Sequence, residues 1–193
     1  MDFYKHLDAS TLLHWTVEDN VSAMRSSLAM SRIHNYLTGA RSQMQRIWVE
    51  LERVRGVGDD WSAALRQAFV DIHFYFVAWD AIGKMMHVVA NSSGFDSARR
   101  VYKRHRKTIE AYRSARHHLE HFDERLPGGR KVGELSIPGD LANLSGSKYS
   151  FGGETWDIGP ASLEKLTAIV EEFEREIREE GIERHRLKFN SDT

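Results

Sequence analysis

An arginine and three histidines lie close together in one stretch of the chain, residues 116–125. Arginine presents a planar fork of N–H donors that fits phosphate oxygens, and histidine exchanges a proton near neutral pH. Side chains of these two types could together bind a phosphate and transfer protons. The candidate catalytic residues for such chemistry are Arg116 and His121, with His117 beside them.

A long predicted helix, about residues 95–126, carries this stretch near its end. Small or apolar residues recur at three- and four-residue intervals, which predicts one core-facing stripe. The stripe consists of Ala98, Val101, Tyr102, Ile109, Tyr112, Ala115, Leu119, Phe122 and Leu126. Pro127 then stops the helix, because proline cannot continue it. Arg116 and His121 are about 140° apart around the axis and are therefore not neighbours on one face, whereas His117 and His121 stack on one face. Arg116 and His121 could still flank a groove where a second helix or a second subunit meets this helix.

The order Arg116-His117-x-x-x-His121, late in a long helix, resembles the R-x4-6-H motif of the HEPN superfamily (higher eukaryotes and prokaryotes nucleotide-binding domains). The residues from His121 to Leu126 are similar to helix ends of bacterial HEPN-like proteins. The resemblance covers about residues 15–126 and implies a metal-independent endoribonuclease whose site forms across a homodimer.

The resemblance also implies the role of each motif residue. His121 would be the base, Arg116 the phosphate clamp, and His117 would orient the substrate or donate a proton. The product would end in a 2′,3′-cyclic phosphate. The implied biological setting is a toxin–antitoxin or defence system, with RNA as substrate and an antitoxin-like protein as a further partner.

A dense basic run in the first half of the same helix could bind the RNA backbone. Its candidate substrate-binding residues are Arg100, Lys103, Arg104 and Lys107, and Tyr102 lies among them. Cations interleaved with aromatic rings suit an RNA track, but a solvent-facing helix surface has the same pattern.

Three acidic residues are candidate supports for the site. Asp80 lies in an apolar part of the preceding helix, on the same face as His73. A carboxylate buried there needs a partner, and Arg116 is a plausible one, although an ordinary internal ion pair would look the same. Glu120 and Asp123 could orient the imidazoles.

Three other interpretations of this stretch compete with the nuclease. His117 and His121, together with His118, Glu120 or His73, could bind a metal, but the spacing is not that of H-E-x-x-H. Our prediction itself names no metal and no other cofactor. The chain could also be a catalytically inactive HEPN-like binding or partner module. Finally, cations near a helix C-terminus complement the helix dipole.

The remaining elements predict an all-α, antiparallel four-helix up-down bundle with a small β-hairpin insertion before the last helix. The first long helix begins near residues 17–20 and ends at Gly56, with an expected core stripe. That stripe consists of Val21, Met24, Leu28, Ile33, Leu37, Met44, Ile47, Trp48, Leu51 and Val54. We expect one domain over residues 1–193, with an N-terminal arm (1–16), the insertion (127–159) and a mobile tail (182–193).

The second and last long helices complete this bundle. The second, about residues 59–94, is apolar nearly all round, which is typical of a central helix or of one that faces another subunit. The last helix begins at Pro160, a favourable first-turn residue, and is expected to end at Gly181. The hairpin is predicted around Gly152 and Gly153.

Composition limits the possible functions. A hydrophobic fraction of 41% in 193 residues indicates a folded globule, and a net charge of −1 provides no overall basic field for nucleic acid. The absence of cysteine excludes disulfides and thiolate metal sites. The first residues lack a signal-peptide pattern, and charged residues interrupt the most apolar run, so that we expect a soluble cytoplasmic protein.

Overall fold

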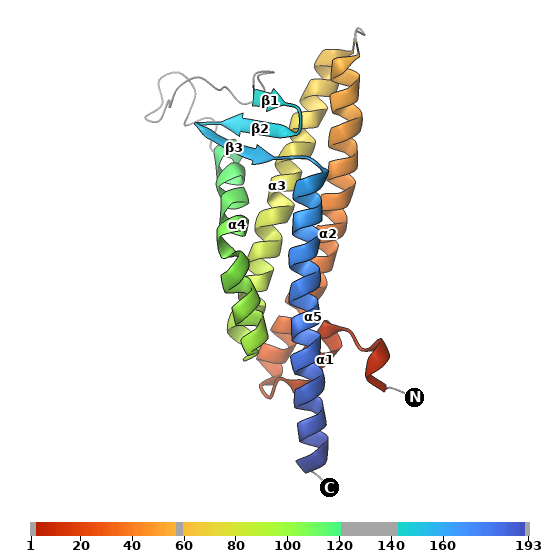
Figure 1. The fold of residues 1–193 in the computed structure, drawn as a ribbon, viewed down its shortest axis with the longest axis vertical. Coiled ribbons are helices and arrows are strands. Elements are labelled where there is room, and N and C mark those ends of the chain that lie inside the picture. The colour runs from red at the N-terminus through yellow and green to blue at the C-terminus, as the bar shows by residue number, and fades with distance from the viewer. Residues whose placement is uncertain (1–2, 57–59, 121–142, 192–193) are drawn as a thin grey trace. The chain divides into compact units, whose positions relative to one another are not determined.

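A computed structural model of the chain describes residues 3–56, 60–120 and 143–191. A short 3-10 helix, η1 (Phe3–His6), precedes α1 (Ala9–Thr16), α2 (Asn20–Arg55), α3 (Trp61–Ser92), α4 (Asp96–Glu120), β1 (Leu144–Ser145), β2 (Lys148–Phe151), β3 (Glu154–Asp157) and α5 (Pro160–Ser191) (Figure 1). The described helices pack antiparallel, and a small antiparallel sheet precedes the last one. The structure confirms the expected fold class.

Two compact units share the four long helices. The first unit comprises residues 1–36, 81–107 and 167–193, and the second comprises residues 37–80 and 108–166. Each of α2, α3, α4 and α5 contributes one segment to each unit. The expectation of one domain over residues 1–193 stays a prediction. None of the helices in the described part of the chain combines the length and the apolarity needed to cross a membrane.

In the first unit, the beginning of α2 differs from the expected pattern. Small side chains, among them Ala23 and Ser26, occupy the buried positions, and the Ser26 hydroxyl shares a 3.1 Å hydrogen bond with Ser92 of α3. Small residues let helices approach closely, so that the larger apolar residues of these turns point outward. The expected core residues that are instead more than half exposed are Val21, Met24 and Leu28.

The last helix also differs from expectation, because it continues past Gly181 to Ser191. A Cβ atom on Gly181 would lie 2.9 Å from the Cβ atom of Leu12 in α1. This glycine therefore serves close packing rather than helix termination. The expected mobile tail begins as helix, and within it the Nδ1 atom of His185 lies 3.1 Å from the hydroxyl of Tyr4.

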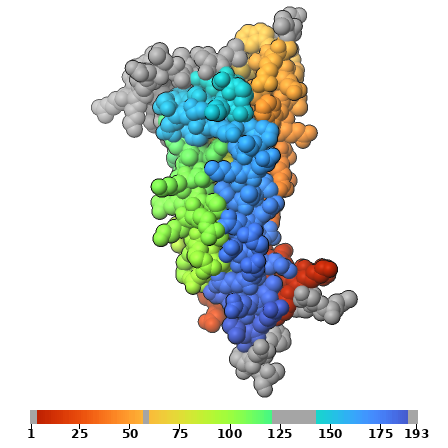
Figure 2. Space-filling model, in the orientation of Figure 1, coloured from red at the N-terminus to blue at the C-terminus, as the bar shows by residue number. Residues whose placement is uncertain are grey.

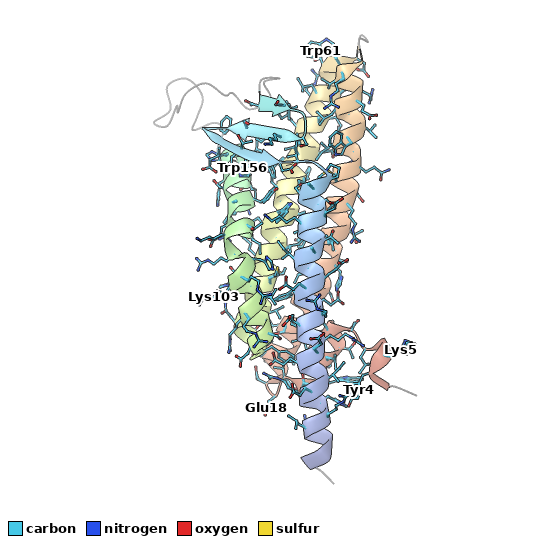
Figure 3. The ribbon with its side chains drawn as sticks, in the orientation of Figure 1. Tyr4, Lys5, Glu18, Trp61, Lys103 and Trp156 are labelled. Carbon is cyan, nitrogen blue, oxygen red and sulfur yellow. The ribbon has the colours of Figure 1, made fainter. Side chains whose placement is uncertain are left out.

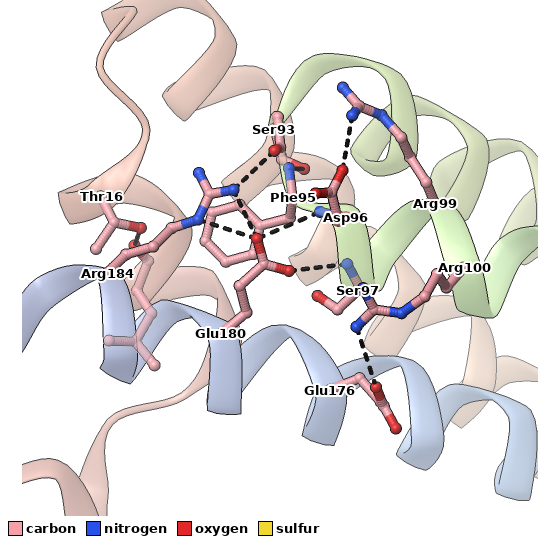
Figure 4. A network of polar contacts seen from close by, with 12 residues as sticks. Thr16, Ser93, Phe95, Asp96, Ser97, Arg99, Arg100, Glu176, Glu180 and Arg184 are labelled. Atoms are coloured by element: carbon pink, nitrogen blue, oxygen red, sulfur yellow. Dashed lines mark hydrogen bonds and ion pairs between the residues drawn. The ribbon is translucent and has the colours of Figure 1, made fainter.

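The start of α4 is fixed by a carboxylate of α5 in the first unit (Figure 4). Glu180 accepts hydrogen bonds from the backbone N–H groups of Asp96 and Ser97 at 3.2 and 2.8 Å, and Arg184 donates to the same carboxylate at 2.6 Å. Burial raises the pKa of Glu180, but the hydrogen bonds from Ser97 and Arg184 outweigh it and hold that pKa below its ordinary value of 4.5. Glu180 thus acts as a helix cap supplied from another helix.

In the second unit, the predicted hairpin is confirmed. Gly152 and Gly153 have φ values of 58° and 80°, as a two-residue turn between twisted strands requires, and Tyr149 of β2 pairs with Trp156 of β3. The sequence did not predict β1, because two residues are too short to show an alternating pattern. β1 pairs antiparallel with β2, which gives a three-stranded sheet.

Two hydrogen bonds attach this sheet to α4. The indole N–H of Trp156, which Figure 3 labels, donates to the carbonyl of Ala111 at 2.8 Å. The Tyr112 hydroxyl donates to the carbonyl of Asp157 at 3.0 Å. Tyr112 also stacks on Trp79 of α3, with ring centroids 3.9 Å apart. The sheet, α3 and α4 therefore share one aromatic core.

The cap at the start of α4 generates a stability prediction. Glu180→Gln removes the charge that the N–H groups of Ser97 and Asp96 bind, so that the free energy of unfolding at neutral pH falls by about 1 kcal/mol, as for other helix caps. Because the folded-state pKa of Glu180 is lowered, its contribution is present above the unfolded-state pKa and is lost as the pH falls through the folded-state value.

Urea unfolding of wild type and Glu180→Gln at several pH values measures this difference. Glu179→Gln is the matched control, since Glu179 is the exposed neighbour in the same helix. If both variants unfold alike at neutral pH, or if the difference persists in strong acid, the capping role is wrong.

Candidate functional site

Asp80 is the buried anchor of the candidate site in the second unit. Only 1% of this residue is exposed, although it carries a carboxylate. The Nε atom of Arg113 donates to its Oδ1 atom at 2.9 Å, and the Nη1 atom of Arg116 donates to its Oδ2 atom. The ion pair that the sequence suggested between Asp80 and Arg116 is therefore present. Both arginines lie on α4, three residues apart, and face the same carboxylate.

Glu120 holds the other side of the Arg116 guanidinium. The Nη2 atom of Arg116 lies 2.8 Å from the Oε2 atom of Glu120, one turn further along α4. This hydrogen bond lowers the pKa of Glu120 below its ordinary value, against a smaller opposing effect of burial. The same contact raises the pKa of Arg116. The guanidinium is thus fixed between two carboxylates.

His73 of α3 lies at the end of this chain of contacts. Its Nε2 atom is 4.0 Å from the Oε1 atom of Glu120, too far for a hydrogen bond. Its ring stacks on the neighbouring Phe74, with centroids 5.7 Å apart and an interplanar angle of 20°. The structure therefore joins His73, Glu120, Arg116, Asp80 and Arg113 into one network, which we call the Asp80 network.

The histidines of α4 have different surroundings. His117 is exposed, and its electrostatic influence also lowers the pKa of Glu120. His118 is largely buried against the sheet: its ring centroid lies 5.4 Å from that of Trp156, and its Nε2 atom lies 3.7 Å from the Oε1 atom of Glu154. His117 thus lies near the Asp80 network, whereas His118 helps to attach the sheet.

Two predicted site residues, His121 and Asp123, lie outside the described residues. Glu120 is the last described residue of α4. The geometry of the Arg116 and His121 pair, and the expected helix stop at Pro127, therefore stay predictions.

The predicted RNA-binding run belongs to the first unit, where half of it is paired with α5. Figure 2 shows the side chains of α4 and α5 side by side. Arg104 forms an ion pair with Glu172, and Arg100 lies 3.8 Å from Glu176. Burial raises the pKa of Glu172, but contacts with His105 and Arg104 outweigh it and lower that pKa.

Lys103 and Lys107 are the exposed cations of this run without an ion-pair partner among the described residues. They lie four residues apart and thus on one side of α4. If a phosphate backbone binds along this surface, the positive charges that are not already compensated by α5 are those of these two lysines.

Arg113 is the site residue that the sequence reasoning did not identify. The available signal was its spacing: it precedes Arg116 by three residues, so that both side chains leave the helix on neighbouring sides. A buried aspartate facing that helix could have been expected to bind both guanidinium groups.

The Asp80 network is chemically suited to hold an arginine. Its two guanidinium groups and two carboxylates cancel in charge, and the imidazole of His73 lies beside it. Within the described part of the chain, no three histidine, aspartate or glutamate side chains are close enough together to hold a metal ion. A metal site that includes His121 would depend on a residue outside that part.

In comparisons with known proteins, no family model, no curated protein and no solved structure matches this chain. The HEPN resemblance of residues 15–126 accordingly stays an expectation that rests on the motif itself.

Proposed function

We propose that this chain is a metal-independent endoribonuclease of HEPN type. The ribose 2′-OH attacks the adjacent phosphorus while His121 accepts its proton, and the 5′-oxygen leaves with a proton from His117. The products are a 2′,3′-cyclic phosphate and a free 5′-hydroxyl. Arg116 binds the phosphate oxygens and stabilises the extra negative charge of the phosphorane.

The observation that supports this proposal most is the fixation of Arg116. Asp80 and Glu120 hold its guanidinium near the end of α4, five residues before His121 in the sequence. A free arginine side chain loses about 2 kcal/mol of rotamer entropy when it is immobilised. When the protein already holds the arginine side chain, most of this entropy is lost on folding and not on substrate binding.

We extend the proposal to a homodimer whose two sites act on one RNA strand. On α3, Val70 and Phe74 are 47% and 51% exposed, although both are apolar. They lie on one side of the helix, and Phe74 contacts His73 of the Asp80 network. Two copies joined through this face would bring their networks near a common axis. We expect such a nuclease to act in the cytoplasm, and the resemblance implies a toxin–antitoxin or defence system with an antitoxin-like protein partner.

One observation favours a second candidate, a catalytically inactive HEPN-like binding module. Both terminal nitrogens of Arg116 contact carboxylates, and the charges of the Asp80 network cancel. A phosphate would therefore meet no net positive charge unless an imidazole is protonated. A module of this kind would bind a partner through the bundle surface and leave RNA intact.

A cleavage assay in EDTA tests the nuclease. Wild-type protein should cut RNA into fragments with 2′,3′-cyclic phosphate ends. Arg116→Ala and His121→Ala should each lower the rate by about a hundredfold or more, since each removes one stabilising or proton-transferring group. Gel analysis of end-labelled RNA, with mass spectrometry of the product ends, gives both readouts.

Arg66→Ala is the matched control for this assay. Arg66 is an exposed arginine of α3 in the same unit, and its hydrogen bond is to Ser62 rather than to the Asp80 network, so that this variant should retain most of the activity. Equal cleavage by all four proteins would show that the activity comes from elsewhere. No cleavage by wild type would favour the binding module.

The dimer proposal predicts that a charge at Phe74 weakens self-association. Phe74→Asp should raise the dimer dissociation constant by at least about tenfold, because a two-fold interface contains the substitution twice. Sedimentation equilibrium measures the constant. Val49→Asp is the control, since Val49 is a half-exposed apolar residue of α2 in the same unit. A wild-type protein that stays monomeric at high concentration would contradict the dimer.

A further inference from the structure

We infer that His73 is a further member of the phosphate site: it takes up a proton when a phosphodiester binds Arg116, and the resulting imidazolium pairs with Glu120. The inference rests on the proposed function, because it takes an RNA phosphodiester as the anion that Arg116 binds. It adds to that function a residue from α3, which lies outside the Arg116 and His121 motif.

The charge balance of the Asp80 network favours proton uptake when an anion binds. The Asp80 network contains the cations Arg113 and Arg116 and the anions Asp80 and Glu120. Without a protonated imidazole its net charge is zero. A bound phosphodiester brings one negative charge, and a partly buried site disfavours an uncompensated charge. Uptake of one proton restores neutrality.

Geometry identifies His73 as the acceptor of this proton. Its Nε2 atom is shielded from solvent, has no hydrogen-bond partner among the described residues, and lies 4.0 Å from the Oε1 atom of Glu120. In imidazolium both ring nitrogens carry an N–H group, so that Nε2 is then a donor, and a small movement of either side chain gives a charge-assisted hydrogen bond to Glu120. The contact with Phe74 orients the ring.

The pairing also changes what Arg116 can do. Glu120 is shared: its Oε2 atom contacts the Nη2 atom of Arg116, and its Oε1 atom faces His73. When imidazolium neutralises this carboxylate, the guanidinium is attracted to it less strongly, and an N–H group of Nη2 becomes available to a phosphate oxygen. Proton uptake and anion binding therefore favour each other, as linked equilibria must.

Other charged groups enter the same balance through Glu120. Arg116 and the exposed His117 of α4 both interact with this carboxylate, and Asp80 of α3 binds Arg116. Among the described residues, Glu120 is the acidic group within ion-pair distance of His73. His117 is the competing proton acceptor, so that the experiment must separate the two imidazoles.

Calorimetric titration with a short oligodeoxythymidylate tests the inference. This probe offers phosphodiesters that do not titrate near neutral pH and lacks the 2′-OH that cleavage requires. Titrations in buffers of different ionisation enthalpy count the protons taken up. Wild type should take up protons on binding and bind roughly tenfold more tightly at about pH 6 than at about pH 8.

Two substitutions at His73 should change the affinity for the probe in opposite directions. His73→Gln, neutral at every pH, should bind at its weak high-pH level throughout and take up no proton. His73→Lys, charged at every pH tested, should bind at about pH 8 as tightly as wild type does at about pH 6. Gain of affinity in the lysine variant cannot come from misfolding. His87→Gln, a histidine of α3 in the first unit, and His117→Gln should both keep the wild-type pH dependence.

The possible failures are distinguishable. If His117→Gln abolishes the proton uptake and His73→Gln does not, or if wild type binds the probe equally at both pH values, the role of His73 is overturned. If the pH dependence vanishes only in His73→Gln but wild type never cleaves RNA, the inference holds and the nuclease is wrong. If RNA is cleaved and His73→Gln binds like wild type, the nuclease stands without it.

Discussion

The burial of one carboxylate determines the arrangement at the end of α4. Asp80 lies among apolar residues of α3, where an unpaired negative charge would be very costly. Two guanidinium groups from α4 bind this carboxylate, and both bonds form only when α4 and α3 are aligned in one register. The stacked rings of Trp79 and Tyr112 lie beside this contact and fix the same pair of helices. The polar and aromatic contacts thus agree on one register, and Arg116 has little freedom left.

That fixation has two opposite chemical consequences. A guanidinium held by Asp80 and Glu120 is preorganised for a phosphate, yet those same carboxylates neutralise its charge. In our proposal, the difference between a nuclease and an inert module therefore depends on the groups beside the network. Among these, the imidazole of His73 lies 4.0 Å from the Glu120 carboxylate that competes for Arg116.

Sequence patterns predicted the features that local chemistry determines. Gly152 and Gly153 indicate a tight turn, Pro160 indicates a helix start, and a buried aspartate requires a cation. The features that were missed depend on neighbours far away in the sequence. Gly181 resembles a helix end until the side chain of Leu12 is known to lie against it. In the same way, the exposed Met24 can be understood only from the small residues that let α2 approach its neighbours.

The basic run of α4 shows why charge in a sequence is a poor guide to binding. Read alone, Arg100 and Arg104 extend a phosphate track, but α5 places Glu176 and Glu172 against them at the matching four-residue interval. Antiparallel helices with opposite charges at this spacing form ion pairs with each other, so that these charges are compensated within the protein. An arginine that structure has already paired binds RNA only if the phosphate competes for it. At Arg104 the paired carboxylate, Glu172, already contacts the imidazole of His105 at 2.8 Å, whereas at Arg116 the imidazole of His73 lies 4.0 Å from the shared carboxylate of Glu120.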